Sequence, residues 1–301
     1  MTNTRKNKIR DSFDDKIYYV LVNIILAIIA VIVLYPLIFV VSASFSSREA
    51  IMNGRVFLWP IDITLEGYQL VFQNRNVIIG YRNSLIYTFF GTSLSVFFTM
   101  VCAYPLSKKE LPFRKPIMFL FIFTMFFGGG MIPNFMLMRS LNILNTRTVM
   151  IVPGMISVFN MIIARTFIIN TIPEELQDAA MIDGCRHTKF FFKILMPLSK
   201  AVMAVLALQY GVARWNAWFG ALIYLTDRSL FPLQLFLRQI LIANQISAQD
   251  FADPEMIEAM QGMAELLQYS LIVVASVPVI LLYPFVQKYF TKGVMLGSVK
   301  G

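Results

Sequence analysis

The sequence predicts an all-α membrane protein, and two observations lead to this prediction. Of the 301 residues, 57% are hydrophobic and only 14% are charged, whereas about 25% of the residues of a soluble domain are charged. The apolar residues also fall into long runs of about 20 residues, the length that a helix needs to cross a bilayer. Because the hydrocarbon core offers no water to the backbone, such runs must form helices.

Six spanning helices are expected, at roughly residues 17–41, 82–105, 116–137, 148–170, 199–225 and 267–287. Basic residues precede the first run, as in a signal peptide. Its apolar stretch is longer than the roughly 7–15 residues of a signal peptide, so we expect a retained anchor. No repeat, linker or low-complexity tract divides the chain. The sequence therefore predicts a single transmembrane domain over residues 1–301.

The basic residues indicate the orientation of these spans. With the N-terminus inside, the inner segments carry sixteen Lys and Arg residues and the outer segments carry eight. The positive-inside rule therefore favours cytoplasmic N- and C-termini. The inner set is Arg5, Lys6, Lys8, Arg10, Lys16, Lys108, Lys109, Arg114, Lys115, Arg186, Lys189, Lys193, Lys200, Lys288, Lys292 and Lys300. Because this set is divided among four segments, no nucleic-acid partner is expected.

A polar segment at about residues 171–198 separates the fourth and fifth predicted spans. Thr171 and Glu174 have the spacing of a capping box, and Pro173 suits the first turn of a helix. Acidic residues near this start, such as Glu175, would favour the positive end of the helix dipole. We therefore expect the first cytoplasmic helix to begin here.

The end of this first helix is expected at Gly184, because glycine accepts the left-handed conformation that follows many helices. A second helix, from about residue 186 to residue 195, would end before Pro197, where the fifth span begins. The segment thus reads as a helix–turn–helix on the cytoplasmic face. Ala179 and Ala180 would let another surface approach closely, and the run Phe190–Phe192 would offer it apolar contacts. The alternative is an amphipathic loop that rests on the membrane surface.

The spacing of this segment is similar to a known motif. Asp178-Ala179-Ala180, Gly184, Ile194 and Pro197 resemble the EAA loop of ABC importer permeases, with Asp178 in place of Glu and Met196 in place of Leu. The resemblance covers nearly the whole chain and is to the carbohydrate-uptake, binding-protein-dependent (maltose-type) inner-membrane family. The segments 127–133 and 225–229 resemble its branch named for lipoproteins and complex polysaccharides.

This resemblance implies a non-catalytic permease subunit that moves an oligosaccharide by alternating access, with acidic and complex oligosaccharides as the candidates. It implies a bacterial cytoplasmic membrane, with lipid around the spans. The implied protein partners are a second, different permease subunit, two ATPase subunits and an extracellular solute-binding protein. The chain itself would hold no cofactor and no metal, because the partner ATPase binds ATP and Mg²⁺. The implied ATPase-coupling residues are Glu174, Glu175, Asp178, Ala179, Ala180, Gly184 and Pro197.

Arg214 is the most unusual charge within a predicted span. It lies about 15 residues after Ser199, or roughly 22 Å along a helix, and charges at such depth are commonly functional. Arginine, amides and aromatic rings together suit a saccharide path, and Arg214 would complement the carboxylate of an acidic sugar. The candidate path residues are Gln209, Tyr210, Arg214, Trp215, Asn216 and Trp218. The alternative is that the tryptophans form an interfacial belt and Arg214 extends to the outer surface.

Two further features bear on mechanism. Gly128-Gly129-Gly130 and Pro133 break the third span, either as a hinge or to allow close helix packing. The sequence contains no P-loop motif and no chain of intramembrane acidic residues, which disfavours ATP binding and proton-driven transport by this chain. A stand-alone secondary carrier or channel, and an ABC permease for a non-sugar solute, remain the alternative interpretations.

Overall fold

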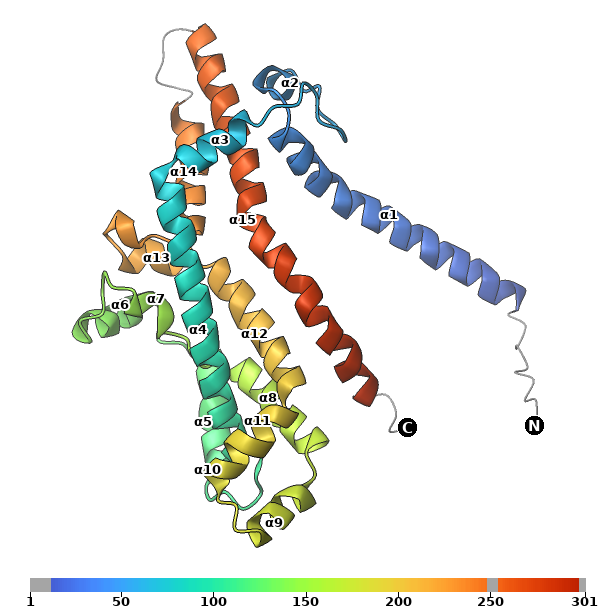
Figure 1. The fold of residues 1–301 in the computed structure, drawn as a ribbon, viewed down its shortest axis with the longest axis vertical. Coiled ribbons are helices and arrows are strands. Elements are labelled where there is room, and N and C mark those ends of the chain that lie inside the picture. Colours follow the sequence, from blue (N-terminus) through green and yellow to red (C-terminus); the bar gives the residue numbers. More distant parts are fainter. Residues whose placement is uncertain (1–11, 248–253, 298–301) are drawn as a thin grey trace. The chain divides into compact units, whose positions relative to one another are not determined.

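The computed structural model describes residues 12–247 and 254–297, and every regular element in these residues is helical (Figure 1). The N-terminal basic residues 5–10 and Lys300, used above for orientation, lie outside the described residues. The chain divides into two compact units. The first comprises Met1–Leu70 with Ser247–Val273, and the second comprises Val71–Ile246 with Val274–Gly301. The single transmembrane domain expected over residues 1–301 stays a prediction.

The first unit contains α1 (Phe13–Ser44), α2 (Arg48–Met52), most of α3 (Glu66–Gln73) and the first part of α15 (Pro254–Gly297). Helices of the second unit are α4 (Arg75–Ser107), α5 (Arg114–Phe126), α6 (Met131–Ser140), α7 (Thr148–Ile151), α8 (Val158–Thr171), α9 (Glu174–Ile182), α10 (His187–Phe190), α11 (Met196–Leu198), α12 (Lys200–Trp215), α13 (Phe219–Tyr224), α14 (Leu233–Ser247) and the rest of α15. A π-helical turn, Phe191–Leu195, joins α10 to α11.

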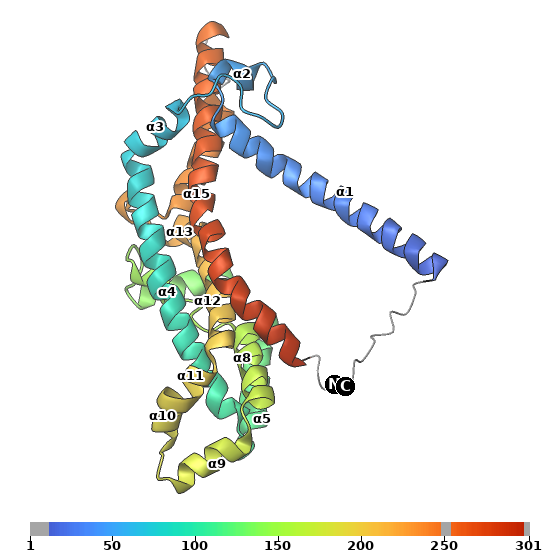
Figure 2. The same ribbon diagram turned by 45° about the vertical axis from the view of Figure 1, so that its right-hand side comes forward.

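In the first unit, the end of α1 packs against α2 and the first part of α15 (Figure 2). Ala43, Ala50 and Leu266 are fully buried there. Gly67 of α3 lies so close to α15 that an added Cβ would lie 2.1 Å from Ser270 Oγ. Most side chains of α1 before this contact are apolar and exposed, as expected of a helix that faces lipid.

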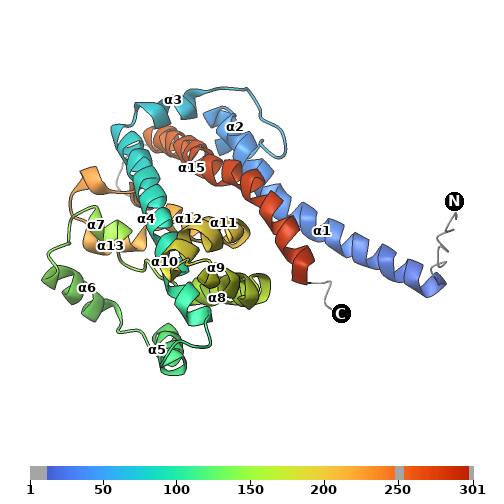
Figure 3. The ribbon, with the colours of Figure 1, turned by 60° about the horizontal axis from the view of Figure 1, so that its bottom comes forward.

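The core of the second unit lies where α4, α8 and α12 pack together (Figure 3). Met100, Met161 and Leu206 are fully buried at this contact. Arg165 of α8 donates from Nε to the carbonyl of Leu106, 2.8 Å away, near the end of α4. A cation at a helix C-terminus satisfies a free carbonyl and favours the helix dipole, so Arg165 joins α8 to α4.

The predicted spans differ in continuity. Within the described residues, α1, α4 and α15 are long and apolar enough to cross a membrane without a break, and two bent helix pairs raise the number of candidate spans to five. The predicted spans 148–170 and 199–225 are each interrupted, around Pro153-Gly154 and around Asn216. The number of six spans therefore stays a prediction.

The break at the three glycines is confirmed, and it is larger than a kink. The axes of α5 and α6 differ by 113°, and Gly130 has φ +84°, a conformation that favours glycine. The close-packing explanation is wrong for the described residues. An added Cβ at Gly128 or Gly130 would meet no atom within 4 Å, and one at Gly129 would meet only Pro133, at 3.8 Å. These glycines instead allow the sharp bend between α5 and α6.

A close approach between α4 and α14 gives a test of this packing. An added Cβ at Gly80 would lie 2.7 Å from Phe236 Cδ2 and 3.0 Å from the Cα of Leu233. We expect Gly80→Ala to destabilise the protein by about 1–3 kcal/mol, the usual effect of overpacking, and to lower its Tm in detergent. Gly220→Ala is the matched control, because its Cβ would meet only the Tyr224 ring, at 3.9 Å. Equal Tm values for the two variants would contradict this packing.

Candidate functional site

The polar segment 171–198 folds as two helical stretches joined by a tight turn. The predicted capping box is wrong, because Thr171 still belongs to α8 and Pro173 is the N-cap of α9, with no side-chain hydrogen bond. A threonine inside the preceding helix cannot direct its hydroxyl to the next one. The prediction that acidic residues occupy the first turn of α9 is confirmed by Glu174 and Glu175.

The turn at Gly184 is confirmed. Gly184 has φ +74°, and its N–H donates to the carbonyl of Met181. The N–H of Cys185 donates to the carbonyl of Ala180, 2.8 Å away. These bonds satisfy two of the free carbonyls at the end of α9. A helical run from His187 to Leu198 then follows. The expected end of this run before Pro197 is wrong, because the exposed Pro197 lies in the first turn of α11, where its missing N–H costs no hydrogen bond.

The side chains of α9 divide between solvent and core. Glu174, Glu175, Asp178 and Ala179 are exposed, so the acidic and small residues form one accessible face. Ala180 is only 8% exposed and packs in the core of the second unit. Of the two small residues assigned to the approach of another surface, Ala179 alone is therefore accessible. Ala180 instead lets α9 lie close to its own core.

The expectation that three phenylalanines offer apolar contacts to another surface is wrong for two of them. Phe190 is fully buried and Phe191 is 6% exposed, because both pack on Tyr104 at the end of α4. The ring of Phe190 stacks on that of Tyr104 with centroids 5.9 Å apart, and Phe191 lies at 5.8 Å. Phe192 is exposed.

Tyr104 connects α4 to both helices of this segment. Its hydroxyl donates to Gln177 Oε1 of α9 and lies within hydrogen-bond distance of His187 Nδ1 of α10, both at 3.4 Å. Lys109 adds an exposed ion pair with Glu174, with Nζ and Oε1 3.1 Å apart. The two helices and the turn are thus held on the end of α4, while the acidic face of α9 is left in solvent.

Lys108 has a more buried position beside the Tyr104 ring, with its Nζ 5.6 Å from the ring centroid. Burial lowers the pKa of the Lys108 ammonium, and the carboxylates of Glu110, Glu174 and Asp178 act against that shift. Its charge therefore lies within the electrostatic range of the acidic face. Sequence reasoning placed Lys108 and Lys109 on the inner side but did not connect them to the α9 carboxylates.

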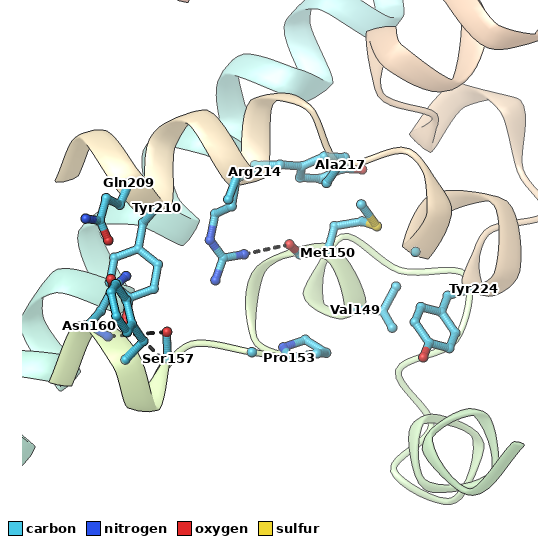
Figure 4. A pocket seen from close by; sticks show the side chains of 15 residues that line it. Val149, Met150, Pro153, Ser157, Asn160, Gln209, Tyr210, Arg214, Ala217 and Tyr224 are labelled. Carbon is cyan, nitrogen blue, oxygen red and sulfur yellow. Dashed lines mark hydrogen bonds between the residues drawn. The ribbon is translucent and has the colours of Figure 1, made fainter. Parts of the chain in front are cut away.

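A cavity of about 510 Å³ lies in the second unit between α12, α7 and α8 (Figure 4). Its wall includes the irregular segment 152–157, whose Pro153 and Gly154 interrupt the fourth predicted span. Irregular backbone at membrane depth is tolerated where it lines a cavity. The polar side chains in the wall are Tyr87, Ser157, Asn160, Gln209, Tyr210, Arg214 and Tyr224.

Three of the six predicted path residues line this cavity: Gln209, Tyr210 and Arg214. Tyr210 is held firmly in place. Its hydroxyl accepts a hydrogen bond from the Ser157 N–H, 2.9 Å away, and lies 2.7 Å from Thr99 Oγ1. Tyr210 thereby joins α12 to α4 and to the start of α8.

Arg214 extends from α12 into the cavity, toward the α7 segment (Figure 4). Its Nη1 donates to the Met150 carbonyl and its Nη2 to Ser95 Oγ, both at 3.0 Å. The buried Nε has no hydrogen-bond partner. Gly91 of α4 makes room for this side chain, because an added Cβ would lie 2.5 Å from Arg214 Cδ. The alternative expectation that Arg214 extends to the outer surface is therefore wrong.

The other three predicted path residues are not in the cavity wall. Trp215 is buried and donates from Nε1 to the Ala275 carbonyl of α15, 2.9 Å away. The exposed Asn216 donates to the Val212 carbonyl of its own helix. One face of the Trp218 ring is covered by the Arg238 guanidinium, whose Cζ lies 3.5 Å from the ring centroid. These contacts give each side chain a structural partner.

Sequence reasoning missed Tyr104, Gly91 and Ser95, which contribute to the two sites from α4. The only local signal was weak: Tyr104-Pro105 lies at the inner end of a predicted span, and Gly91 and Ser95 are small residues one helical turn apart. Across residues 12–247 and 254–297, no group of three or more His, Cys, Asp or Glu side chains is arranged to hold a metal ion.

The chain matches none of the known protein-family models. It is 38% identical over 287 residues to the polygalacturonan/rhamnogalacturonan transport system permease protein YtcP of Bacillus subtilis (strain 168), covering 95% of this chain and 99% of that protein. It is 37% identical over 279 residues to the protein LplC of the same organism, covering 91% of each.

A solved structure is also similar to this chain. The chain is similar, with a TM-score of 0.84 and 33% identity, to a chain in the crystal structure of a bacterial ABC transporter involved in the import of the acidic polysaccharide alginate. The similarity covers 93% of this chain and 99% of that chain. Three observations lead to the same family: the helical architecture, the polar segment with its Asp-Ala-Ala and glycine, and these relatives. This chain belongs to the family of carbohydrate ABC transporter permeases.

Proposed function

We propose that this chain is one of two different permease subunits of a binding-protein-dependent importer and that residues 171–198 couple it to a cytoplasmic ATPase. The remaining partners would be two ATPase subunits and an extracellular solute-binding protein, with ATP and Mg²⁺ bound by the ATPase. The observation that carries the proposal is the exposed acidic face of α9, held on the end of α4 through Tyr104.

The coupling role rests on how this face is attached. A surface that transmits motion must be accessible to its partner and must not move independently of the spanning helices. Glu175, Asp178 and Ala179 meet the first requirement because they are exposed. The Tyr104 contacts and the buried Phe190 meet the second, because they connect the segment to α4 at several points.

The transport role rests on the cavity. Its wall combines amide, hydroxyl and aromatic side chains, which suit the hydroxyl groups and the apolar C–H faces of a saccharide. Two of the relatives are named for the transport of polygalacturonan and rhamnogalacturonan and for the import of alginate, so an oligosaccharide is the proposed substrate. In this mechanism ATP binding closes the ATPase pair, the segment 171–198 moves with it, and the spanning helices change the side from which the cavity is open.

The proposed location is the bacterial cytoplasmic membrane, with both termini in the cytoplasm. The excess of Lys and Arg in the inner segments supports this orientation. Lys108 and Lys109 lie beside the carboxylates of α9, so the end of α4 and the coupling segment share one side.

Reconstitution tests the whole proposal. The purified chain alone in liposomes should accumulate no saccharide, because it has no energy source of its own. With its second permease, its ATPase and its binding protein, we expect uptake that depends on ATP, measured with a radiolabelled oligosaccharide. Equal uptake by the chain alone would show a stand-alone carrier or channel.

The two alanines of α9 separate docking from folding. We expect Ala179→Trp to leave the Tm unchanged, because the side chain is exposed, and to reduce ATPase co-purification by roughly tenfold, the effect of about 1.4 kcal/mol. Ala180→Trp should instead lower the Tm, because Ala180 is buried. Full ATPase retention by Ala179→Trp would contradict docking at this face.

The turn at Gly184 gives a second test of coupling. With φ +74°, a β-branched residue here is strained by about 1–3 kcal/mol, which would shift α10 relative to α9. We expect Gly184→Val to remain inserted in the membrane but to hydrolyse ATP without saccharide uptake. Gly184→Asn should retain coupling, because asparagine tolerates the left-handed region. The measurement is the ratio of ATP hydrolysed to saccharide imported, and equal ratios for both variants would reject the argument.

A further inference from the structure

Arg214 carries a positive charge into the cavity, and no acidic side chain accompanies it there. Its two hydrogen-bond acceptors, the Met150 carbonyl and Ser95 Oγ, are neutral. The cavity wall contains no Asp or Glu within the described part of the chain. Arg214 also forms none of the ion pairs found in that part. An arginine at membrane depth pairs with another ionisable group or with backbone carbonyls, and Arg214 has only a partner of the neutral kind.

We propose that Arg214 binds the carboxylate of an acidic saccharide as it passes through this cavity. The inference rests on the proposed transport function and adds to it the charge of the substrate and the residue that recognises it. A guanidinium has five N–H donors in a planar fork that matches a carboxylate. Two of the five are used by Met150 and Ser95, so donors remain for a ligand.

The existing contacts orient the guanidinium without neutralising it. Met150 belongs to α7 and Ser95 to α4, so Arg214 is held from two sides of the cavity. Such a tethered side chain loses little conformational freedom when it binds a ligand. A carboxylate in the cavity would provide the charge-assisted hydrogen bond that neutral acceptors cannot.

The rest of the wall suits the sugar ring to which this carboxylate is attached. Asn160 and Gln209 present amides, and Tyr224 and Tyr87 present aromatic rings with hydroxyl groups. The volume of about 510 Å³ lies within the roughly 300–1,000 Å³ typical of small-molecule sites. A single basic group in an otherwise neutral polar wall indicates a sugar that carries a carboxylate, a uronate unit, rather than a free inorganic anion.

Gly91 provides a way to move the guanidinium without removing its charge. An added Cβ at Gly91 would lie 2.5 Å from Cδ, 2.6 Å from Nε and 2.7 Å from Cζ of Arg214. Gly91→Ala must therefore displace the side chain. Gly211→Ala is its matched control, because an added Cβ at this buried glycine of α12 would meet only Thr92 Oγ1, at 3.7 Å.

The experiment uses the assembled importer in lipid nanodiscs and a pair of probes with the same skeleton. Trigalacturonate carries carboxylates, and its fully methyl-esterified form carries none. Binding is measured by titration calorimetry, with inorganic phosphate as a third probe, and ATP-dependent uptake is measured in proteoliposomes. The wild-type importer should bind trigalacturonate more tightly than the ester or phosphate, and added salt should weaken this preference.

The variants identify the residue. Arg214→Gln and Gly91→Ala should each weaken trigalacturonate binding by at least about tenfold, as expected for loss of a hydrogen bond to a charged group. Binding of the ester should change by less than about twofold, since a neutral ligand lacks that bond. Gly211→Ala should bind both probes as the wild type does. If Arg214→Gln is unstable by its Tm, Gly91→Ala alone decides the matter, because it retains the charge.

Three outcomes would overturn the inference. The wild type could show no preference for trigalacturonate, or it could bind phosphate as tightly as trigalacturonate. In the third, both variants would lose equal affinity for the acid and for the ester. In each case ATP-dependent uptake of the ester by the same wild-type importer would leave the proposed transport function standing. If the wild-type importer showed no ATP-dependent uptake of either saccharide, the proposed function itself would be rejected.

Discussion

The contact between Tyr104 and the two helices of the polar segment joins the water-facing and the membrane-facing parts of the second unit. Tyr104 is near the end of α4, and α4 also packs on α8 and α12. Helices α9 and α10 are therefore connected to the helices around the cavity through two aromatic contacts and two hydrogen-bond contacts of Tyr104. Arg165 strengthens the same end of α4 through the Leu106 carbonyl.

The cavity depends on helices that do not run straight. Pro153 and Gly154 end α7 early, and the chain re-enters α8 only at Val158. This interruption leaves the Met150 carbonyl free to accept from Arg214 and leaves the Ser157 N–H free to donate to Tyr210. The backbone groups that a continuous helix would satisfy internally are used here to fix the polar side chains of the wall. Broken spans and the polar cavity are thus two aspects of one arrangement.

Patterns that act over a short stretch of chain were predicted well. The three continuous apolar helices, the break at Gly128–Gly130 and the turn at Gly184 were all expected from local composition. The capping box at Thr171 failed because α8 extends through this residue. The burial of Phe190 and Phe191 was also missed, since their partner Tyr104 is far away in sequence. Three of the six path residues were expected in the cavity and found elsewhere, because the sequence alone does not tell which side chains in and after α12 face the cavity.

The sequence by itself determined the helical class, the membrane environment and the position of the polar segment, because hydrophobic length and turn chemistry depend on neighbouring residues. Only the tertiary structure decided which side chains meet. Tyr104 and His187 are 83 positions apart, and Ser95 and Arg214 are 119 positions apart. Such pairs come together through the packing of α4 on distant helices. This packing depends on small residues such as Gly91, whose role is visible only when its neighbour is in place.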